Sequence, residues 1–336
     1  MSSITQPNQK QEDRSLDQAL RPKKWSDYIG QEAVKKNLKI LIQAALERNE
    51  PVEHLLFYGP PGTGKTSLAL LIAKEMNCQI KTTSGPAIEK VGDLAAILTN
   101  LSAKDILFID EAHRLNKLIE EILYPAMESR NLDIIIGKGP SARIFQLQLP
   151  PFTLIAATTR ASLLSGPLRS RFSGGAFRLE FYSQEEINQI LTNSSKILNI
   201  EAEAAALEEI AKRSRFTPRV ANRLLKRCRD YAQVYQQKID KETTLAALKL
   251  LELDELGLEK TDRTILSAII TKFNGGPVGI QTLAAAVTED ERTIEELYEP
   301  YLMRLGFLAR TPRGRTATKR AYEHLKIIQP SQSSLI

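Results

Sequence analysis

One eight-residue stretch constrains this chain more than any other feature. Residues 59–66 read Gly-Pro-Pro-Gly-Thr-Gly-Lys-Thr and match the pattern G-x-x-x-x-G-K-[ST]. The apolar run His54–Tyr58 before it predicts a buried strand, and the run Ser67–Lys74 after it predicts a helix. In that context the glycines let backbone N–H groups face a phosphate, and the helix adds the positive end of its dipole. We therefore predict a phosphate-binding loop, because a plain glycine-rich turn needs neither flanking element.

The loop predicts a site for a nucleotide and Mg²⁺. Lys65 is expected to meet the β- and γ-phosphates, and the Thr66 hydroxyl to bind Mg²⁺. The whole set of expected loop contacts is Gly59, Gly62, Thr63, Gly64, Lys65, Thr66 and Ser67. An acidic pair, Asp110-Glu111, ends the apolar run Asp105–Asp110, at the edge of the sheet where the loop is expected. Such a pair can simply be solvated, but here we expect Asp110 to hold Mg²⁺ through water and Glu111 to orient or activate the attacking water.

Apolar runs that predict strands alternate with amphipathic runs that predict helices, which indicates an α/β fold with a parallel, doubly wound sheet. Residues 131–149 interrupt this rhythm with two β-rich runs around a Gly-Lys-Gly-Pro turn, and predict an inserted β-hairpin. From Ser183 to Leu253 the pattern is helical and rich in alanine. We expect three domains, at residues 1–182, 183–253 and 254–336, with a loose tail over residues 1–15.

The composition argues against several classes of protein. Lys and Arg number 46 against 40 Asp and Glu, and the net charge of +6 permits nucleic-acid binding without proving it. Cys78 and Cys228 are solitary, which disfavours a disulfide framework or a zinc site. No apolar run approaches the roughly 18 residues of a membrane span, and the polar N-terminus lacks a signal peptide. We expect a cytoplasmic protein with no membrane association.

The acidic pair fits two superfamilies of nucleotide-driven enzymes. Asp110 to His113 spells Asp-Glu-Ala-His, the signature of one superfamily of nucleic-acid helicases. The next predicted strand, Phe152–Thr159, ends in two threonines rather than in the Ser-Ala-Thr of that superfamily. It resembles instead the sensor 1 strand of AAA+ ATPases, in which a small polar side chain reads the γ-phosphate or the water. Thr159 fits the usual register, with Thr158 as the alternative.

Other segments also resemble AAA+ ATPases. The stretch Gly166–Phe172 resembles the place of the arginine finger, which reaches the nucleotide of a neighbouring subunit; Arg171 is our choice, with Arg169 second. Arg219, after Thr217-Pro218, resembles the sensor 2 arginine of a helical lid. Segments near the N-terminus resemble the part that packs on adenine. The further nucleotide contacts that this resemblance implies are Leu20, Arg21, Tyr28, Ile29, Tyr182, Pro218 and Arg219.

A narrower resemblance is to the bacterial RuvB family of Holliday-junction branch-migration motors, and it runs in order from about Leu20 to about His324. It is carried by Arg21-Pro22, residues 59–66, 82–86, 107–111, 123–128, 150–154, 157–160, 275–277 and 310–315. Two departures stand out. Ala156 occupies a place where we expect glycine, and the stretch Ser173–Phe177 has one residue more than usual after the expected finger.

The C-terminal segment has the layout of a winged helix independently of that resemblance. An apolar stripe between Ile294 and Leu305 packs a core, and a basic hairpin follows it. Arg310, Arg313 and Arg315 are expected to crowd the exposed tip of this hairpin. A solvated charge cluster is the ordinary interpretation, but an arginine-rich wing on such a scaffold suits contact with DNA phosphates and the minor groove.

The resemblance implies an ATP-dependent motor for branch migration in homologous recombination, DNA repair and the SOS response. A finger acting on a neighbour requires a repeating interface, and the resemblance implies a homo-hexameric ring around duplex DNA, working with RuvA and with the resolvase RuvC. Ile134, Ile135 and Ile136 in the hairpin predict an apolar surface for a protein contact, with core or subunit packing as the alternative. The resemblance implies that this contact is with RuvA. Two other functions share parts of the pattern: a sliding-clamp loader and a replication initiator in which ATP is an assembly switch.

Overall fold

The computed structural model describes residues 17–136 and 143–329 and divides the chain into two compact units. One unit spans Arg21–Phe181, and the other joins the residues up to Leu20 to Tyr182–Ile336. Within the described ranges every helix is too short or too polar to cross a lipid bilayer.

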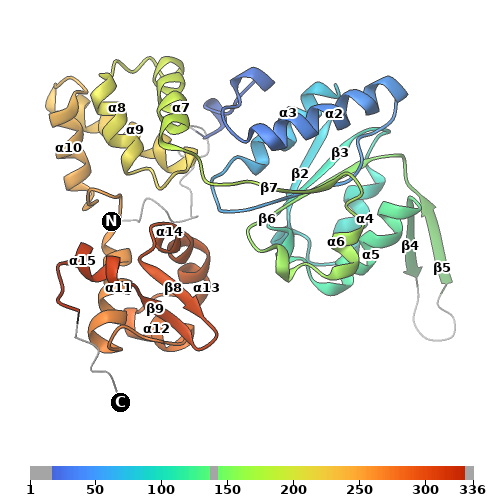
Figure 1. The fold of residues 1–336 in the computed structure, drawn as a ribbon. Coiled ribbons are helices and arrows are strands. Elements are labelled where there is room, and N and C mark those ends of the chain that lie inside the picture. Colours follow the sequence, from blue (N-terminus) through green and yellow to red (C-terminus); the bar gives the residue numbers. More distant parts are fainter. Residues whose placement is uncertain (1–16, 137–142, 330–336) are drawn as a thin grey trace. The chain divides into compact units, whose positions relative to one another are not determined.

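The first unit is built on a five-stranded sheet (Figure 1). Its strands follow the order β2-β3-β6-β1-β7, and all neighbouring pairs are parallel, which confirms the predicted α/β class. The strands are β1 (Leu55–Tyr58), β2 (Ile80–Ser84), β3 (Ile106–Asp110), β6 (Thr153–Thr158) and β7 (Gly175–Arg178).

Helices cover both faces of this sheet, because alternate strand residues point to opposite sides. In β1, Leu56 belongs to one buried cluster, whereas Leu55 and Phe57 belong to another. Figure 1 shows α2 and α3 on one face and α4, α5 and α6 on the other. The helices are α2 (Glu32–Arg48), α3 (Lys65–Glu75), α4 (Val91–Thr99), α5 (Lys117–Glu128) and α6 (Gly166–Ser170), with short 3₁₀ turns η1 (Trp25–Asp27), η2 (Gly85–Ala87), η3 (Ala112–Arg114) and η5 (Ala161–Leu163).

The predicted hairpin is present as a separate two-stranded sheet. Strand β4 (Asn131–Ile136) pairs antiparallel with β5 (Arg143–Gln148). On β5, Phe145 and Leu147 are 48% and 40% exposed. Ile134, Ile135 and Ile136 lie on β4, but their side chains and the connecting loop fall outside the described residues.

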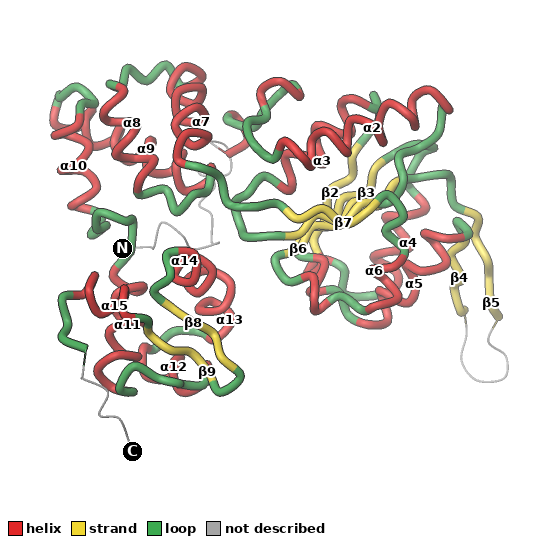
Figure 2. The backbone as a smooth tube through the Cα atoms, viewed as in Figure 1, coloured by secondary structure: helices red, strands yellow, loops and turns green. Residues whose placement is uncertain are grey.

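The second unit begins with four helices, drawn as red tubes in Figure 2. They are α7 (Gln184–Ile197), α8 (Ala204–Lys212), α9 (Pro218–Tyr235) and α10 (Lys241–Leu250). Ser183 begins α7 with a capping box, in which its side chain accepts from the Glu186 amide and the Glu186 carboxylate accepts from the Ser183 amide. The inward faces of the four helices form one buried cluster that includes Tyr182 and Cys228.

The rest of this unit has a winged-helix arrangement. Its elements are α11 (Lys260–Lys272), α12 (Ile280–Val287), α13 (Glu291–Thr293), a π-helical segment η6 (Ile294–Tyr298), α14 (Glu299–Arg304), β8 (Leu308–Thr311), β9 (Gly314–Ala317) and α15 (Lys319–Leu325). The sequence predicts one helix over Glu291–Leu305, and the π-helical turn within it precedes Pro300. A proline lacks the amide for an intrahelical bond and its ring crowds the preceding turn, which accounts for this irregularity.

Candidate nucleotide site and DNA-binding wing

The carboxyl ends of three neighbouring strands bring the sequence-predicted groups to one edge of the sheet. Strand β6 lies between β1 and β3, and Tyr58 at the end of β1 pairs with Thr158 at the end of β6. The amide of Gly59 donates to the carbonyl of Thr158 over 3.2 Å, so the loop begins against this strand. Asp110 ends β3, on the other side of β6. Open α/β sheets bind their ligands at this edge.

The glycines of the loop are required by close backbone packing. A Cβ on Gly59, where φ is +138°, would lie 2.2 Å from the carbonyl oxygen of Leu179. A Cβ on Gly64, where φ is +97°, would lie 2.5 Å from the hydroxyl of Tyr28. Both positions combine a left-handed backbone with a steric limit, so larger side chains are excluded. The loop therefore has the shape that the sequence pattern predicts.

Lys65 is held inside the loop rather than in solvent. It is the first residue of α3 and is 8% exposed. Its ammonium group donates to the carbonyl oxygens of Gly59 at 2.9 Å and Pro60 at 2.7 Å. Thr63 is fully buried; its hydroxyl donates to Pro60, and its carbonyl accepts from the hydroxyl of Tyr28. The positive charge is thus fixed where a loop of this kind places phosphate.

The segment expected to pack on adenine adjoins this loop. Tyr28 is buried in the core that covers the α2 and α3 face of the sheet, and its hydroxyl reaches Thr63. Ile29 and Arg21 are partly buried in the same unit. Leu20 belongs to the other unit. Tyr28 therefore joins the hydrophobic core to the phosphate loop, which a sequence motif alone does not reveal.

The acidic pair has an unusual backbone. Glu111 has a positive φ of 49°, and Asp110 accepts a hydrogen bond from the Glu111 amide at 2.9 Å. A Cβ on Gly85 would lie 2.5 Å from the Glu111 carbonyl oxygen, so a glycine opposite permits this turn. Left-handed non-glycine residues are uncommon and concentrate at functional sites. The Glu111 carboxylate forms a half-exposed ion pair with Arg114 at 3.0 Å.

The two candidate sensor threonines differ in their hydrogen bonds. The Thr158 hydroxyl accepts from the Arg160 amide and shares a hydrogen bond with Nδ1 of His113, both at 2.9 Å. The Thr159 hydroxyl is shielded from solvent and has no hydrogen-bond partner among the described residues. A buried hydroxyl without a partner is costly unless a ligand or water satisfies it. This difference favours Thr159 as the group that meets the nucleotide or its water.

The groups at this edge fit a magnesium nucleotide. Within the described part of the chain, no cluster of three or more His, Cys, Asp and Glu side chains could hold a metal by itself. Mg²⁺ is commonly held by one or two protein oxygens together with substrate phosphates. The Thr66 hydroxyl and the Asp110 carboxylate are protein oxygens of this kind, and they sit at the start of α3 and the end of β3.

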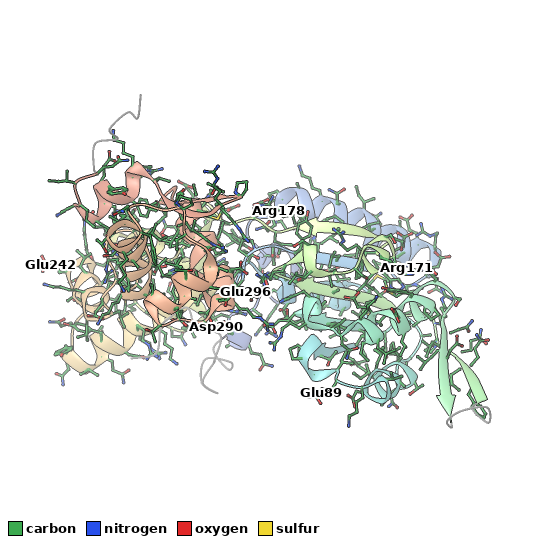
Figure 3. All side chains as sticks on the ribbon, turned by 90° about the horizontal axis from the view of Figure 1, so that it is seen from below. Glu89, Arg171, Arg178, Glu242, Asp290 and Glu296 are labelled. Carbon is green, nitrogen blue, oxygen red and sulfur yellow. The ribbon has the colours of Figure 1, made fainter. Side chains whose placement is uncertain are left out.

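The two candidate finger arginines lie at the C-terminal end of one short helix but in different surroundings. Arg169 is exposed on α6. Arg171, labelled in Figure 3, caps the helix C-terminus and its side chain is only 21% exposed. It stacks on the ring of Tyr124 and pairs with Glu128. The family pattern around Tyr124 gives no indication of this contact.

The remaining nucleotide candidates lie in the second unit. Pro218 begins α9, and Arg219 beside it is 42% exposed and pairs with Asp17 at 3.7 Å. Tyr182 is 3% exposed, and its amide donates to the Phe216 carbonyl at 3.0 Å. The Tyr182 ring packs in the core of the four-helix bundle.

The wing corrects one sequence-based expectation. Arg315 was expected at an exposed tip, but it lies on β9, directly opposite Arg310 on β8, and only Arg313 occupies the two-residue turn. The Arg315 side chain is 7% exposed and pairs with Glu299 at 2.6 Å and Glu295 at 2.8 Å. The expectation of an exposed Arg315 is therefore wrong, because two carboxylates on the preceding helical segment bury and neutralise it.

The other two wing arginines remain accessible. Arg310 is 55% exposed, with Glu295 at 3.3 Å and Glu299 at 3.9 Å. Arg313 is exposed on the turn. Cross-strand neighbours share one face of a hairpin, which explains why Arg310 and Arg315 meet the same carboxylates. The exposed positive charge at this hairpin is therefore smaller than the sequence suggests.

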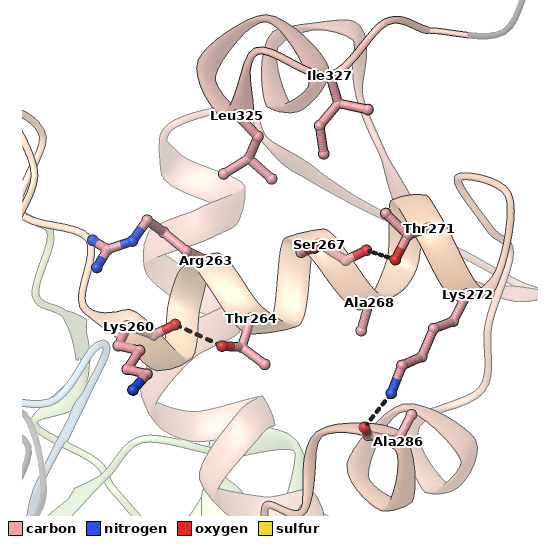
Figure 4. Close-up of a pocket in the computed structure, with 10 residues that line it drawn as sticks. All are labelled: Lys260, Arg263, Thr264, Ser267, Ala268, Thr271, Lys272, Ala286, Leu325 and Ile327. Carbon is pink, nitrogen blue, oxygen red and sulfur yellow. Dashed lines mark hydrogen bonds between the residues drawn. The ribbon is translucent and has the colours of Figure 1, made fainter.

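A pocket of about 450 Å³ lies elsewhere in the winged-helix region (Figure 4). Thr264 and Thr271 donate their hydroxyls to carbonyls one turn back in α11. Lys272 donates to the Ala286 carbonyl, and Arg263 donates to the carbonyls of Leu258 and Glu252. These polar side chains serve the fold, and the pocket does not include any of the nucleotide or wing residues. Its lining is Lys260, Arg263, Thr264, Ser267, Ala268, Thr271, Lys272, Ala286, Leu325 and Ile327.

Comparison with known proteins gives consistent matches along the chain. The model of the Holliday junction DNA helicase RuvB P-loop domain matches residues 20–178. The RuvB AAA lid domain matches residues 182–254, and the RuvB C-terminal winged helix domain matches residues 255–326.

Solved structures of a bacterial protein are similar over almost the whole chain. The Thermotoga maritima RuvB Holliday junction branch migration motor is 48% identical, with a TM-score of 0.85, over 93% of this chain and 100% of that chain. A single-substitution mutant of Thermotoga maritima RuvB gives 48% identity and a TM-score of 0.86 over 93% of this chain and 99% of that one. The resemblance and the fold predicted from the sequence are thus confirmed.

Proposed function

Because this chain belongs to the RuvB family of Holliday junction DNA helicases, we propose that it is an ATP-driven motor of Holliday-junction branch migration in homologous recombination and DNA repair. Family membership makes it a P-loop ATPase of the RuvB type. The observation that supports the proposal most directly is the convergence of Lys65, Asp110 and Thr159 at one sheet edge, two of them on adjacent strand ends.

The residues at this edge have separate tasks in ATP hydrolysis. Lys65 and the backbone N–H groups of the loop bind the β- and γ-phosphates. Glu111 orients the attacking water and accepts its proton, and the Thr159 hydroxyl, which lacks a protein partner among the described residues, donates to the γ-phosphate or the water. Thr66 and Asp110 would hold Mg²⁺, which neutralises phosphate charge when bound.

The finger and the second sensor complete the site in this proposal. Arg171 would reach the nucleotide of a neighbouring subunit, and its charge would stabilise the developing negative charge of phosphoryl transfer. By the family relationship, Arg219 would serve as the second sensor of the γ-phosphate, and we propose Pro218 and Tyr182 as further nucleotide contacts. A finger acting on a neighbour requires a repeating heterologous interface. From the family relationship we propose that this interface closes into a homo-hexameric ring.

The wing and the hairpin give the proposed motor its partners. Arg313 and the half-exposed Arg310 would contact phosphates of duplex or four-way DNA, which positions DNA without reading its sequence. The hairpin presents exposed Phe145 and Leu147 beside the strand of Ile134–Ile136, and we propose it as the docking site for RuvA. From the same family relationship we propose that the protein works beside RuvC in a cytoplasmic complex.

The alternative functions are less well supported. A sliding-clamp loader shares the nucleotide groups but has no use for a wing, and a replication initiator would use its winged helix to read an origin sequence. The RuvB models cover the P-loop, lid and winged-helix regions of this chain in order. This match favours the branch-migration motor over both alternatives.

Two substitutions separate binding from chemistry. We expect Lys65→Ala to lose ATP binding and turnover, whereas Glu111→Gln should bind ATP normally and hydrolyse it at least about 100-fold more slowly. Glu89→Gln is the matched control, because Glu89, labelled in Figure 3, is an exposed carboxylate of the same unit and belongs to none of the sheet's strands. Nucleotide affinity and steady-state turnover would be measured for each. Wild-type turnover in both test variants would refute the site.

The choice of DNA tests the motor itself. Turnover and branch migration would be measured with four-way, linear duplex and single-stranded DNA, with and without RuvA. We expect ATP hydrolysis to drive the movement of four-way junctions. Stimulation only by primer-template DNA with a sliding clamp would indicate a loader, and ATP-dependent binding to one particular sequence without strand exchange would indicate an initiator.

A further inference from the structure

Arg171 is enclosed by side chains of one helix. Its guanidinium carbon lies 4.4 Å from the centre of the Tyr124 ring, and its Nε lies 3.1 Å from a carboxylate oxygen of Glu128. One terminal nitrogen donates to the carbonyl of Pro167 over 2.7 Å. A surface arginine would ordinarily be solvated, with many rotamers available. This one is restricted on three sides.

The two enclosing side chains belong to a stripe on α5. Glu120, Tyr124 and Glu128 are spaced four residues apart, so their side chains lie on the same face of the helix. Glu120 is 5% exposed, whereas the Glu128 side chain is 59% exposed. The stripe therefore runs from a buried carboxylate, through an aromatic ring, to a solvent-exposed carboxylate.

This stripe also fixes the helix that carries Arg171. The Tyr124 hydroxyl shares a 2.8 Å hydrogen bond with the Ser165 hydroxyl, and the Ser165 amide donates to Glu120 over 3.4 Å. Ser165 is the N-cap of α6, since its side chain accepts from the Leu168 amide. The start of α6 and its C-terminal arginine are thus tied to the same face of α5.

We propose that Tyr124 and Glu128 are positioning residues for the arginine finger. They hold the guanidinium of Arg171 in one orientation before a neighbouring nucleotide arrives, so that little rotamer freedom is lost when it meets the γ-phosphate. An exposed ion pair and a cation–π contact are both weak, which lets a phosphate replace Glu128 without a large penalty. This inference rests on the proposed role of Arg171 as a finger acting in trans.

The expected effects can be measured with full-length protein in ATP turnover. Tyr124→Leu should lower kcat about three- to tenfold, because the ring is lost. Tyr124→Phe keeps the ring, so its kcat should remain close to that of the wild type. Glu128→Gln should lower kcat about two- to fivefold. Glu121→Gln is the matched control, since Glu121 is an exposed carboxylate of the same helix outside the stripe.

Two readouts separate positioning from general damage. The nucleotide Kd and KM should stay unchanged in Tyr124→Leu and Glu128→Gln while kcat falls. Mixing either variant with Lys65→Ala subunits should raise turnover per intact phosphate loop, because a Lys65→Ala neighbour supplies a correctly held finger. A weakened Kd, or no recovery in rings where mixing is verified, would mean that the variants damage their own site and would overturn the proposal.

Arg171→Ala distinguishes a failure of the positioning role from a failure of the finger assignment. If Arg171→Ala loses turnover while Tyr124→Leu and Glu128→Gln both match Glu121→Gln, the finger stands and the positioning role is wrong. If Arg171→Ala keeps wild-type turnover, the finger assignment itself is wrong, and the positioning role falls with it.

Discussion

A buried ion pair joins the four-helix bundle to the winged-helix region, and its removal has a calculable effect. The guanidinium of Arg215 is in close contact with the carboxylate of Asp262, and it also lies 3.7 Å from Glu259. The Arg215 side chain is 5% exposed and that of Asp262 is fully buried. Arg215 and Phe216, which we call the elbow, both have left-handed φ values near 55°.

Replacing Arg215 by methionine keeps much of its volume but leaves two carboxylates without a counter-charge. Breaking a buried pair in this way costs about 3–5 kcal/mol. Asp262→Asn should cost less, because Glu259 remains to pair with Arg215. The double variant should be more stable than the sum of the two losses predicts, by about 2 kcal/mol or more.

The pH dependence has a definite sign. Burial raises the pKa of Asp262 to about 6, although Arg215 opposes the shift. An acid whose pKa is higher in the folded state than in the unfolded state contributes stability to the protein at low pH, and this contribution is lost as pH rises through the folded pKa. Without Arg215 this pKa rises further. The difference in the free energy of unfolding between wild type and Arg215→Met should therefore grow between pH 5 and pH 8.

Urea denaturation can measure the loss of stability in the unit that contains the ion pair, with the sheet unit as an internal control. The chain has one tryptophan, Trp25, which is buried in the sheet unit, so its fluorescence reports that unit. Far-UV circular dichroism reports the helices of both. With a slope of about 2 kcal/mol per molar urea, the helical transition of Arg215→Met should move by about 2 M. A shift below about 0.3 M, or strict additivity in the double variant, would refute the argument.

Two further predictions follow from charged groups. Arg313→Ala should reduce the slope of log affinity for duplex DNA against log salt concentration by about 0.9. Arg315→Ala should leave that slope unchanged and destabilise the fold instead, because Arg315 is buried against two carboxylates. Equal effects of the two variants on the slope would contradict this assignment. Burial opposes ionisation of Glu209, but hydrogen bonds from Arg213 and Lys212 outweigh it and lower its pKa to about 2. Its contribution to the free energy of unfolding is therefore present above about pH 4.3 and lost as pH falls towards 2, so the difference between Glu209→Gln and wild type should shrink over that range.

The nucleotide site could be predicted from the sequence because its signals are local. A phosphate loop needs glycines at fixed intervals, and Gly59 and Gly64 show the steric reason. The acidic pair is readable because Asp110 follows four fully buried residues of β3. In both patterns the functional residues lie within a few positions of the residues that fix the backbone around them.

Two strands of the sheet have no such signal. Strands β2 and β7 are its outer strands, and neither is continuously buried. The polar sequence Ile80–Ser84 and the glycine-led Gly175–Arg178 show no run of large apolar residues. Edge strands gain order from their neighbour, so sequence periodicity underestimates them.

Arg315 illustrates a different limit. Its partners Glu295 and Glu299 lie 20 and 16 residues earlier, on a helical segment whose register includes a π-helical turn. An arginine-rich hairpin looks uniformly exposed in the sequence because nothing local marks which arginine faces that segment. The spacing of the two glutamates by four residues was the available hint, since it places both on one helix face.

The elbow suggests how nucleotide chemistry would reach the DNA in the proposed motor. Arg219, the expected second sensor, lies four residues after Arg215. Between them, the Phe216 carbonyl accepts from the amide of Tyr182, where the chain enters the second unit, and the Phe216 ring lies 6.1 Å from that of Tyr301 in the winged-helix region. A buried ion pair and an aromatic contact resist bending at this point. A displacement of Arg219 would therefore move the four-helix bundle and the winged-helix region together. Arg215→Met removes the ion pair that connects them. We therefore expect this variant to move less DNA per ATP hydrolysed, with a smaller effect on the rate of ATP hydrolysis.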